Sequence, residues 1–301
     1  MNTLLYHLAR RIVAAVQALP LRVVARLGRL AGGLAYGLDA RHRRVALRNL
    51  RHCFGGEMTP AEIRALAREV FRRIGENFAS AVKTAAMTAE ELRAHVTYQV
   101  PGELHARPGE TPPSVVVAIG HFGNFELYAR FGEFMHGYQG ATTYRALRQP
   151  AFDRLLRELR ARSGCLFFER RHEGDKLKAA MNQPGLMLGL LCDQRAGRHA
   201  HVLPFVGQPA GTSAAVALLA LRYKCPLRTA ICYRTGLAQW RIEAGPEIPT
   251  HRDGSPRPTA DIMRDVNDAF SAAIRRDPAN WFWVHDRWKP ARGGEAPGPE
   301  D

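Results

Sequence analysis

Short apolar runs that alternate with helix-forming stretches, from residue 114 onward, constrain the fold more than any other feature. We predict strands at 114–119, 140–144, 165–168, 186–192, 227–233 and 238–243. We predict helices at 125–136, 150–163, 174–182, 212–224 and 259–276. Such alternation is typical of strands that lie parallel and are joined by crossover helices. The sequence therefore predicts an α/β fold with a central mixed, largely parallel sheet flanked by helices.

The residues before 114 are predicted to be helical. Thr59 and Glu62 form a capping box, which starts a helix that runs to about Lys83. A second helix starts near Thr88, and the strongly basic segment 39–52 is also expected to be helical. Together with the alternating part, these helices give three predicted regions. They are an amphipathic helical region at 1–38, one main domain at 39–290, and a disordered Gly/Pro-rich tail at 291–301.

The segment 3–38 carries two apolar stripes at helical spacing around Pro20. Their members are Leu5, Leu8, Ile12, Val16 and Leu19, then Val23, Leu27, Leu30 and Leu34. Arg22, Arg26 and Arg29 form a basic stripe beside the second. A basic amphipathic helix can lie in a membrane interface, and the alternative is a helix packed on its own domain with its Arg face in water. The arginines also interrupt the apolar run, so no membrane span or signal peptide is predicted.

The chain has 43 Lys and Arg against 28 Asp and Glu, for a net charge of +15. This excess implies an anionic partner, such as nucleic acid, a phospholipid surface, or a phosphorylated or acidic substrate. No nucleic-acid-binding motif is present, so nucleic acid is not expected. The five cysteines include no Cys-x-x-Cys pair, which disfavours a zinc site or disulfide framework and indicates a reducing compartment.

One strand end carries residues suited to proton transfer. The run SVVVAIG ends at Gly120 and is followed at once by His121, with Glu126 five residues later. Histidine has an unperturbed pKa near 6.5, so it can accept a proton from a hydroxyl, and a carboxylate can hold the resulting imidazolium. The pair converges only if His121 lies in a turn before the helix, which Gly120 and Gly123 permit. A strand-end histidine that merely caps or packs is the alternative.

A second polar residue ends a buried run. Asp193 follows GLMLGLLC, and ligands of α/β sheets collect at the carboxyl ends of strands. We therefore expect Asp193 and His121 at one edge of the sheet, with a capping role as the alternative for Asp193. Its neighbour Gln194 is expected to be structural. Three C-terminal tryptophans are expected to pack in the core or line an acyl groove, and they are Trp281, Trp283 and Trp288.

Six segments in order carry a resemblance to a known family. They are RHRRVALRNLRHCFG (41–55), GHFGNFE (120–126), TTYRALRQPAFDRLLRELRARSG (142–164), GLLCDQRAG (189–197), LPFVGQPAGTSAAVALLALRYKCPL (203–227) and WFWVHDRWK (281–289). Over residues 3–289 the chain resembles the lipid A late acyltransferases, together with related phosphatidylinositol-mannoside and lysophospholipid acyltransferases. The resemblance implies a glycerolipid acyltransferase-like fold. It also implies transfer of a fatty acyl chain from acyl carrier protein or coenzyme A to a lipid hydroxyl.

The resemblance also implies roles for individual residues. His121 would be the general base and Glu126 its partner, whereas four residues would contact substrate: Asn124, Arg145, Arg160 and Asp193. Arg160 is preferred over Arg162 for the functional arginine of its segment. Arg145 is less securely matched, because family members often have proline where this chain has Ala146. Backbone amides after Gly120 and at the start of the following helix would hold an oxyanion or a phosphate.

We expect no metal and no bound cofactor, since the acceptor hydroxyl would attack the donor thioester directly, and the chain has no Ser elbow or Cys-His motif that calls for a covalent acyl-enzyme. The expected partners are an anionic membrane lipid and the acidic acyl carrier protein, at the cytoplasmic face of the inner membrane. The most favoured acceptor is a lipid A precursor. Two alternatives remain: an acyltransferase for a lysophospholipid or another glycolipid, and a basic nucleic-acid- or membrane-binding protein without catalysis.

Overall fold

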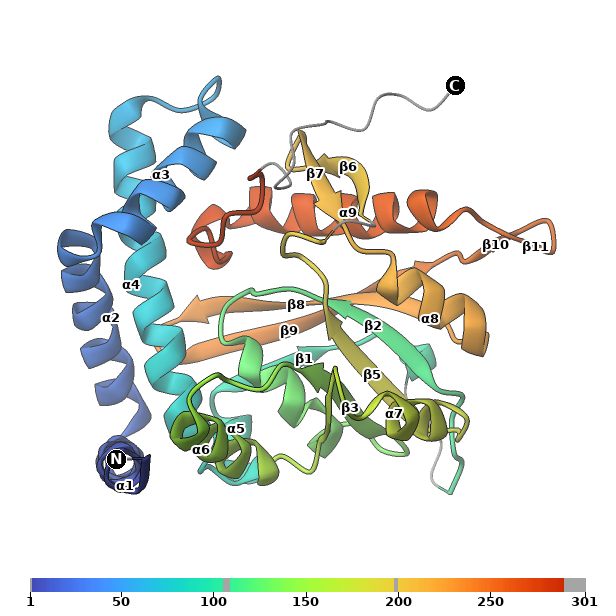
Figure 1. The fold of residues 1–301 in the computed structure, drawn as a ribbon, viewed down its shortest axis with the longest axis horizontal. Helices are drawn as coiled ribbons and strands as arrows, with labels where there is room; N and C mark the ends of the chain where they lie inside the picture. Colours follow the sequence, from blue (N-terminus) through green and yellow to red (C-terminus); the bar gives the residue numbers. More distant parts are fainter. Residues whose placement is uncertain (1, 105–108, 198–199, 290–301) are drawn as a thin grey trace.

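The computed structural model describes residues 2–104, 109–197 and 200–289, so the predicted tail lies outside the described residues. Seven strands form the central sheet in the order β1-β9-β8-β2-β5-β3-β4 (Figure 1). Their bounds are β1 Val96–Gln99, β2 Val115–Ile119, β3 Gln139–Tyr144, β4 Leu166–Glu169, β5 Leu186–Leu191, β8 Leu227–Gly236 and β9 Gln239–Ile248. All neighbouring pairs are parallel except β8 and β9, which form a long antiparallel hairpin. The predicted mixed, largely parallel sheet is confirmed.

Helices precede the sheet and cover both of its faces. The N-terminal ones are α1 Asn2–Ala18, α2 Leu21–Leu38, α3 Ala40–Phe54, α4 Pro60–Thr84 and α5 Ala89–Arg93. The later ones are α6 Pro150–Ala161, α7 Gly174–Met181, α8 Ala215–Tyr223 and α9 Thr259–Arg276, with 3₁₀ helices η1 Gly102–Leu104, η2 Phe125–Glu133 and η3 Pro278–Asn280. Thr59 caps α4 and Thr88 caps α5, each in the reciprocal bond pattern of a capping box.

The two sheet faces bury different side chains of the same strands. In β2, Val116 and Ala118 join a core with α8 and α9, whereas Val115, Val117 and Ile119 join a core with η2. Because successive side chains of a strand point to opposite faces, a strand buried on both faces reads as one continuous apolar run. That is the pattern from which β2 and β5 were predicted.

The structure departs from the predicted elements in four places. The segment 125–136 is expected as an α-helix, but it forms the 3₁₀ helix η2, which ends at Glu133. Strand β1 and two hairpins, β6 His201–Phe205 with β7 Gln208–Thr212 and β10 His251–Arg252 with β11 Ser255–Pro256, have no counterpart in the prediction. All five strands are short, and those of the two hairpins contain Gly, Pro or charged residues, so none of them shows a clear apolar period.

Helix α2 packs on α4 through small residues, not through its predicted apolar stripe. Figure 1 shows the two helices side by side along one edge of the molecule. Gly28 and Gly32 of α2 are buried there, and Gly75 of α4 meets them so closely that an added methyl group would overlap backbone atoms. Arg29 forms ion pairs with Glu69 and Glu76 across the same contact. The backbones can approach this closely only because glycine has no side chain.

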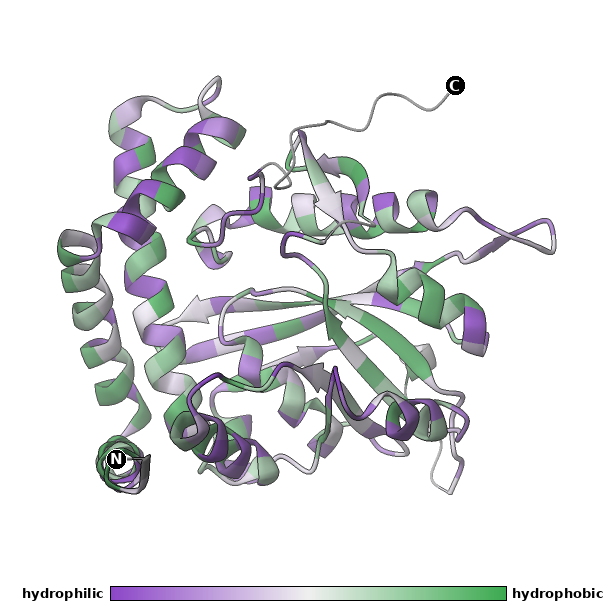
Figure 2. Ribbon diagram, in the orientation of Figure 1, coloured by the Kyte–Doolittle hydropathy of each residue, from purple (hydrophilic) through white to green (hydrophobic). Residues whose placement is uncertain are grey.

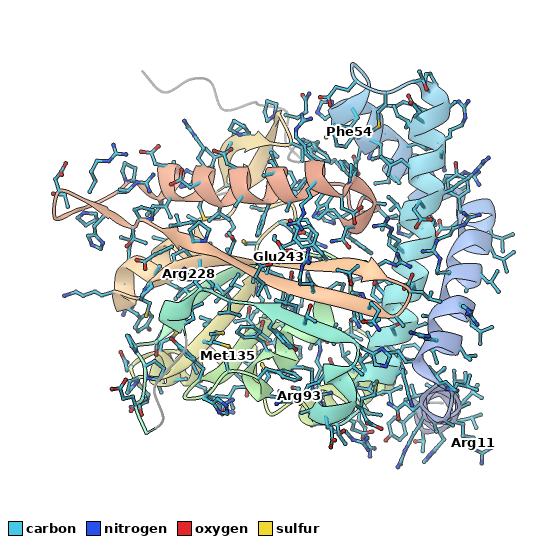
Figure 3. All side chains as sticks on the ribbon, turned by 180° about the vertical axis from the view of Figure 1, so that it is seen from behind. Arg11, Phe54, Arg93, Met135, Arg228 and Glu243 are labelled. Atoms are coloured by element: carbon cyan, nitrogen blue, oxygen red, sulfur yellow. The ribbon has the colours of Figure 1, made fainter. Side chains whose placement is uncertain are left out.

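The predicted apolar stripes of α1 and α2 point away from the rest of the protein. Figure 2 shows much of both helices in the hydrophobic colour, although they lie at the edge of the molecule. The exposed side chains include Leu4, Leu8, Ile12, Leu27, Leu30, Leu34 and Leu38. Arg11 projects from α1 into the open in Figure 3. Across the described ranges, none of the helices has the length and hydrophobicity needed to cross a bilayer.

The α2–α4 contact predicts a position-specific effect of glycine substitution. Gly32→Ala should lower the free energy of unfolding by about 1–3 kcal/mol, because the new methyl group must displace the carbonyl of Phe71. Gly37→Ala, in the same helix, has nothing within 4 Å of the added carbon and should leave stability unchanged or slightly raised. Urea unfolding of both variants checks this. Equal losses in both would mean that close packing is not what holds α2.

Candidate active site

His121 and Asp193 meet at the carboxyl edge of the sheet. Strands β2 and β5 are parallel neighbours, and their last paired residues are Ile119 and Leu191. His121 and Asp193 each lie two residues beyond that pair, so the register carries both side chains to the same level. The Nδ1 atom of His121 lies 2.8 Å from Oδ1 of Asp193.

Three donors hold the carboxylate of Asp193, which is completely buried. Its Oδ1 accepts from the ring of His121, and its Oδ2 accepts from the backbone N–H of His121 at 2.8 Å and from Nε1 of Trp281 at 2.7 Å. Burial alone would raise the pKa of Asp193, but the charge of His121 and these hydrogen bonds outweigh it and hold the pKa below its ordinary value. Asp193 is therefore an ionised carboxylate that is shielded from solvent and hydrogen-bonded to the imidazole.

The turn between β2 and η2 brings backbone and carboxylate close together. A side chain at Gly120 would lie 3.2 Å from Cγ of Asp193 and 2.6 Å from the ring of Phe122. Gly123 has a φ of +51°, in the left-handed region that favours glycine. The amides that follow Gly120 are engaged inside the protein, because those of His121, Phe122 and Gly123 donate to Asp193, Gly120 and Asn280. The expectation that these three amides bind an oxyanion is therefore wrong.

Glu126 is paired with Arg160 instead of with His121. Its two carboxylate oxygens accept from the Nε and Nη2 atoms of Arg160 at 3.0 and 2.6 Å. Such a two-point pairing matches the planar fork of a guanidinium. The partner of His121 expected from the resemblance was Glu126, and the structure gives that position to Asp193. The 3₁₀ turn of η2 directs Glu126 toward α6, which supplies Arg160.

An apolar hollow opens beside this ion pair, between the sheet and η2. Its cavity volume is about 80 Å³. Its lining includes Ile119 and Val117 of β2, Met187 and Gly189 of β5, and Tyr128 of η2, with Glu126 and Arg160 at one side. We call it the sheet hollow. Its apolar lining suits a hydrocarbon group, whose burial would be favoured in proportion to the area removed from water.

Aromatic rings surround the exposed side of His121. The rings of Phe125 and Phe282 lie with centroids 4.9 and 5.9 Å from the imidazole. Phe78 of α4 contacts both of them edge to face. A smaller hollow next to His121 is lined by these rings and by Asn280. The imidazole therefore faces an apolar space, where a polar ligand group would find few competing waters.

Of the other residues predicted to contact substrate, Asn124 is buried near the site, whereas Arg145 is exposed and lies outside the lining of the sheet hollow. Asn124 is buried, its Nδ2 lies 3.5 Å from Oγ1 of Thr84, and its Oδ1 has no hydrogen-bond partner within the described residues. Arg145 is exposed just after β3, outside the lining of the sheet hollow. Arg162 is exposed at the end of α6, so of the two candidate arginines in this helix it is Arg160 that reaches the site.

Sequence reasoning missed two neighbours of the His–Asp pair. Trp281 was expected to pack in the core or line an acyl groove; it is buried, and its Nε1 also donates to Asp193. Gln194 was taken as structural, but its side-chain nitrogen lies 3.3 Å from Nε2 of His121. The bridge between Phe122 and Trp281 is what fixes the tryptophan there. In the described part of the chain, no three His, Cys, Asp or Glu side chains gather as they would around a metal ion.

The hydrogen bond from Trp281 predicts a pH-dependent contribution to stability. Trp281→Phe should lower the free energy of unfolding at pH 7 by about 1.5–3 kcal/mol, since the lost partner is a charged acceptor. The pKa of Asp193 is depressed in the folded state, so its contribution is complete above the ordinary value of 3.8 and is lost as pH falls through the folded-state value. The difference in free energy of unfolding between Trp281→Phe and the unmodified protein should therefore become smaller below pH 3.8, as measured by urea unfolding.

Trp283→Phe is the matched control for this experiment. Trp283 is equally buried, but its Nε1 donates to the neutral carbonyl of Pro278. Its loss should cost less, about 0.5–1.5 kcal/mol, and should not vary over the same pH range. If both variants lost the same free energy of unfolding at every pH, the hydrogen bond from Trp281 would not stabilise the charged form of Asp193.

Comparison with known proteins identifies the family of the chain. The profile of the bacterial lipid A biosynthesis acyltransferase family matches residues 2–290, which is nearly the whole chain. A search of curated proteins finds no significant match. The match spans the helices at the N-terminus, the sheet, and the segment that carries Trp281. The chain belongs to the bacterial lipid A biosynthesis acyltransferase family.

Proposed function

We propose that this acyltransferase moves a fatty acyl chain from a thioester, on acyl carrier protein or coenzyme A, to a hydroxyl of a lipid A precursor. The observation that carries the proposal is the His121–Asp193 pair, which lies where two parallel strands end, close to an apolar hollow. A general base beside a space for hydrocarbon is what direct transfer to a lipid hydroxyl needs. Membership of the family supports the same reaction class.

The hydrogen bond between His121 and Asp193 supports a tautomer of His121 with its proton on Nδ1. The Nδ1–H donates to Asp193, so the lone pair of Nε2 can accept the proton of the acceptor hydroxyl once that hydroxyl replaces the amide of Gln194, which lies 3.3 Å away. The hydroxyl oxygen then attacks the thioester carbonyl, and the C–S bond breaks as the ester forms. The proton held by His121 passes to the departing thiolate. Asp193 orients the ring throughout and stabilises the imidazolium.

The sheet hollow is proposed to hold the acyl chain of the donor. Arg160 lies at its side, where a guanidinium can stabilise negative charge on the reacting oxygen or hold a phosphate of either substrate. Glu126 keeps this guanidinium in place, so we assign it a positioning role. The net charge of +15 supports attraction of an acidic carrier protein and of a phosphorylated lipid.

Removal of the proposed base should abolish transfer without unfolding the protein. His121→Ala should reduce the rate by about 10²–10⁴-fold, since that is the usual contribution of a general base. The measurement is transfer of a labelled acyl chain from acyl carrier protein or coenzyme A to a lipid A precursor, with circular dichroism to verify the fold.

Two comparisons make this experiment decisive. Asp193→Asn retains the size of the side chain and should also lose most of the activity, because the amide cannot stabilise an imidazolium. Arg162→Ala, at an exposed position of α6, should retain it. Near-normal turnover by His121→Ala would refute the mechanism. Transfer to a lysophospholipid but not to the lipid A precursor would leave the mechanism intact and refute the proposed acceptor.

We further propose that α1 and α2 attach the enzyme to the cytoplasmic face of the inner membrane. Support comes from the exposed leucines of both helices, which lie beside the exposed Arg10, Arg11, Arg22 and Arg26. Apolar side chains that enter the headgroup boundary, with cations near anionic lipid, are typical of interfacial helices. A lipid acceptor would then reach the enzyme from within the bilayer.

A surface variant tests this attachment without disturbing the fold. The combined change of Leu8, Ile12, Leu30 and Leu34 to Ser should abolish sedimentation with vesicles that contain anionic phospholipid, because all four side chains are exposed. Added salt should weaken the binding of the unmodified protein.

The control is a protein with Val202→Ser and Leu218→Ser, two other exposed apolar residues away from α1 and α2. It should sediment as the unmodified protein does. Equal sedimentation of both variants would contradict the proposed attachment.

A further inference from the structure

A second apolar space, distinct from the sheet hollow, lies between α4, α6 and η2. Its cavity volume is about 340 Å³. Its lining is largely aliphatic and aromatic, with Val82 and Ala85 from α4 and its end, and Leu156 and Leu159 from α6. We call it the α4–α6 groove. The proposed mechanism, which needs one chain-binding space for the donor, leaves this groove unassigned.

The groove and the sheet hollow share one wall. Phe125, Glu126 and Ala129 of η2 line both, as does Arg160 of α6. Phe125 and Glu126 also line the small hollow that contains His121. Each apolar space therefore ends beside the same ion pair and close to the proposed base. Two hydrocarbon chains could approach one reacting centre from opposite sides of η2.

The groove also adjoins the proposed membrane-attached helix. Gln17 of α1 donates to the carbonyl of Val82, and Lys83 donates to the carbonyl of Gln17. Tyr6 of α1 packs with Leu155 of α6, next to the groove residue Leu156. The exposed Phe78 of α4 lies at the groove as well. The groove thus borders the edge of the molecule where α1 lies next to α6 (Figure 1), whereas residues of η2 line the sheet hollow.

We infer that the α4–α6 groove binds an acyl chain of the acceptor lipid, while the sheet hollow binds the acyl chain of the donor. The inference rests on the proposed function, since an enzyme that joins an acyl group to a lipid must accommodate hydrocarbon from both substrates. A lipid drawn from the bilayer would enter beside α1. Its hydroxyl would then reach His121 past Phe78 and Phe125, which separate the groove from the base.

Variants that fill one space at a time test the assignment. Leu156 lines the groove but not the sheet hollow. Leu156→Trp should therefore raise the KM for a lipid A precursor in detergent micelles about tenfold or more, because the larger ring would displace several methylene groups of the lipid from the groove. The KM for the acyl donor should stay within about twofold. Ala85→Leu, also confined to the groove, gives the same test with a smaller side chain should the first variant fold poorly.

Two further variants serve as matched controls. Arg162→Trp adds the same ring to the exposed end of α6 and should leave both KM values unchanged. Gly189→Val fills the sheet hollow, where an added carbon would already lie 3.2 Å from Ile119. It should raise the donor KM, most for the longest chains, and leave the acceptor KM unchanged.

The outcomes separate this inference from the proposed function. A raised acceptor KM with an unchanged donor KM in Leu156→Trp supports the assignment. A raised donor KM in that variant, or no change in either value in both groove variants, would overturn it even though transfer occurs. If the unmodified protein transfers no acyl chain to any lipid hydroxyl, the proposed function fails, and the assignment falls with it.

Discussion

The buried carboxylate of Asp193 is the group on which the site depends. It accepts two hydrogen bonds from His121 and one from Trp281, although the tryptophan is 88 residues away in the sequence. A carboxylate without solvent is stable only when donors surround it, because the desolvation of an ionised group is costly. These bonds therefore fix the rotamer of the imidazole, the path of the turn after β2 and the position of the C-terminal segment together.

The sheet makes this arrangement possible because its strands are parallel. Only parallel neighbours bring the ends of β2 and β5 to one edge, and the pairing of Ile119 with Leu191 places the next polar residues level. This part of the site follows from the sequence, because each strand is an uninterrupted apolar run that ends in a polar residue. The fold class was predictable for the same reason, whereas the family was predicted from the six segments that carry the resemblance, and both are confirmed.

The pairing of individual side chains could not be predicted in this way. Glu126 is near His121 in sequence, which suggested a pair, but the 3₁₀ turn of η2 sends it to Arg160, 34 residues further on in α6. Helix type in such a short segment depends on what packs against it, and sequence period cannot distinguish 3₁₀ from α over two turns. The hydrogen bond of Trp281 to Asp193 could not be predicted either. A tryptophan that only packs in the core and one that also donates to a carboxylate look the same in the sequence.

The Glu126–Arg160 pair has a geometric consequence that differs from the role of a catalytic dyad. It stands in the wall that divides the sheet hollow from the α4–α6 groove, and both side chains are only partly exposed. An ion pair in an apolar surrounding resists separation, because each charge would lose its partner without gaining full hydration. In the proposed mechanism, the pair would keep the two hydrocarbon spaces apart, with its charged edge next to the reacting atoms. His121 and Asp193 would then supply the proton transfer, and Glu126 and Arg160 would determine where the two chains end.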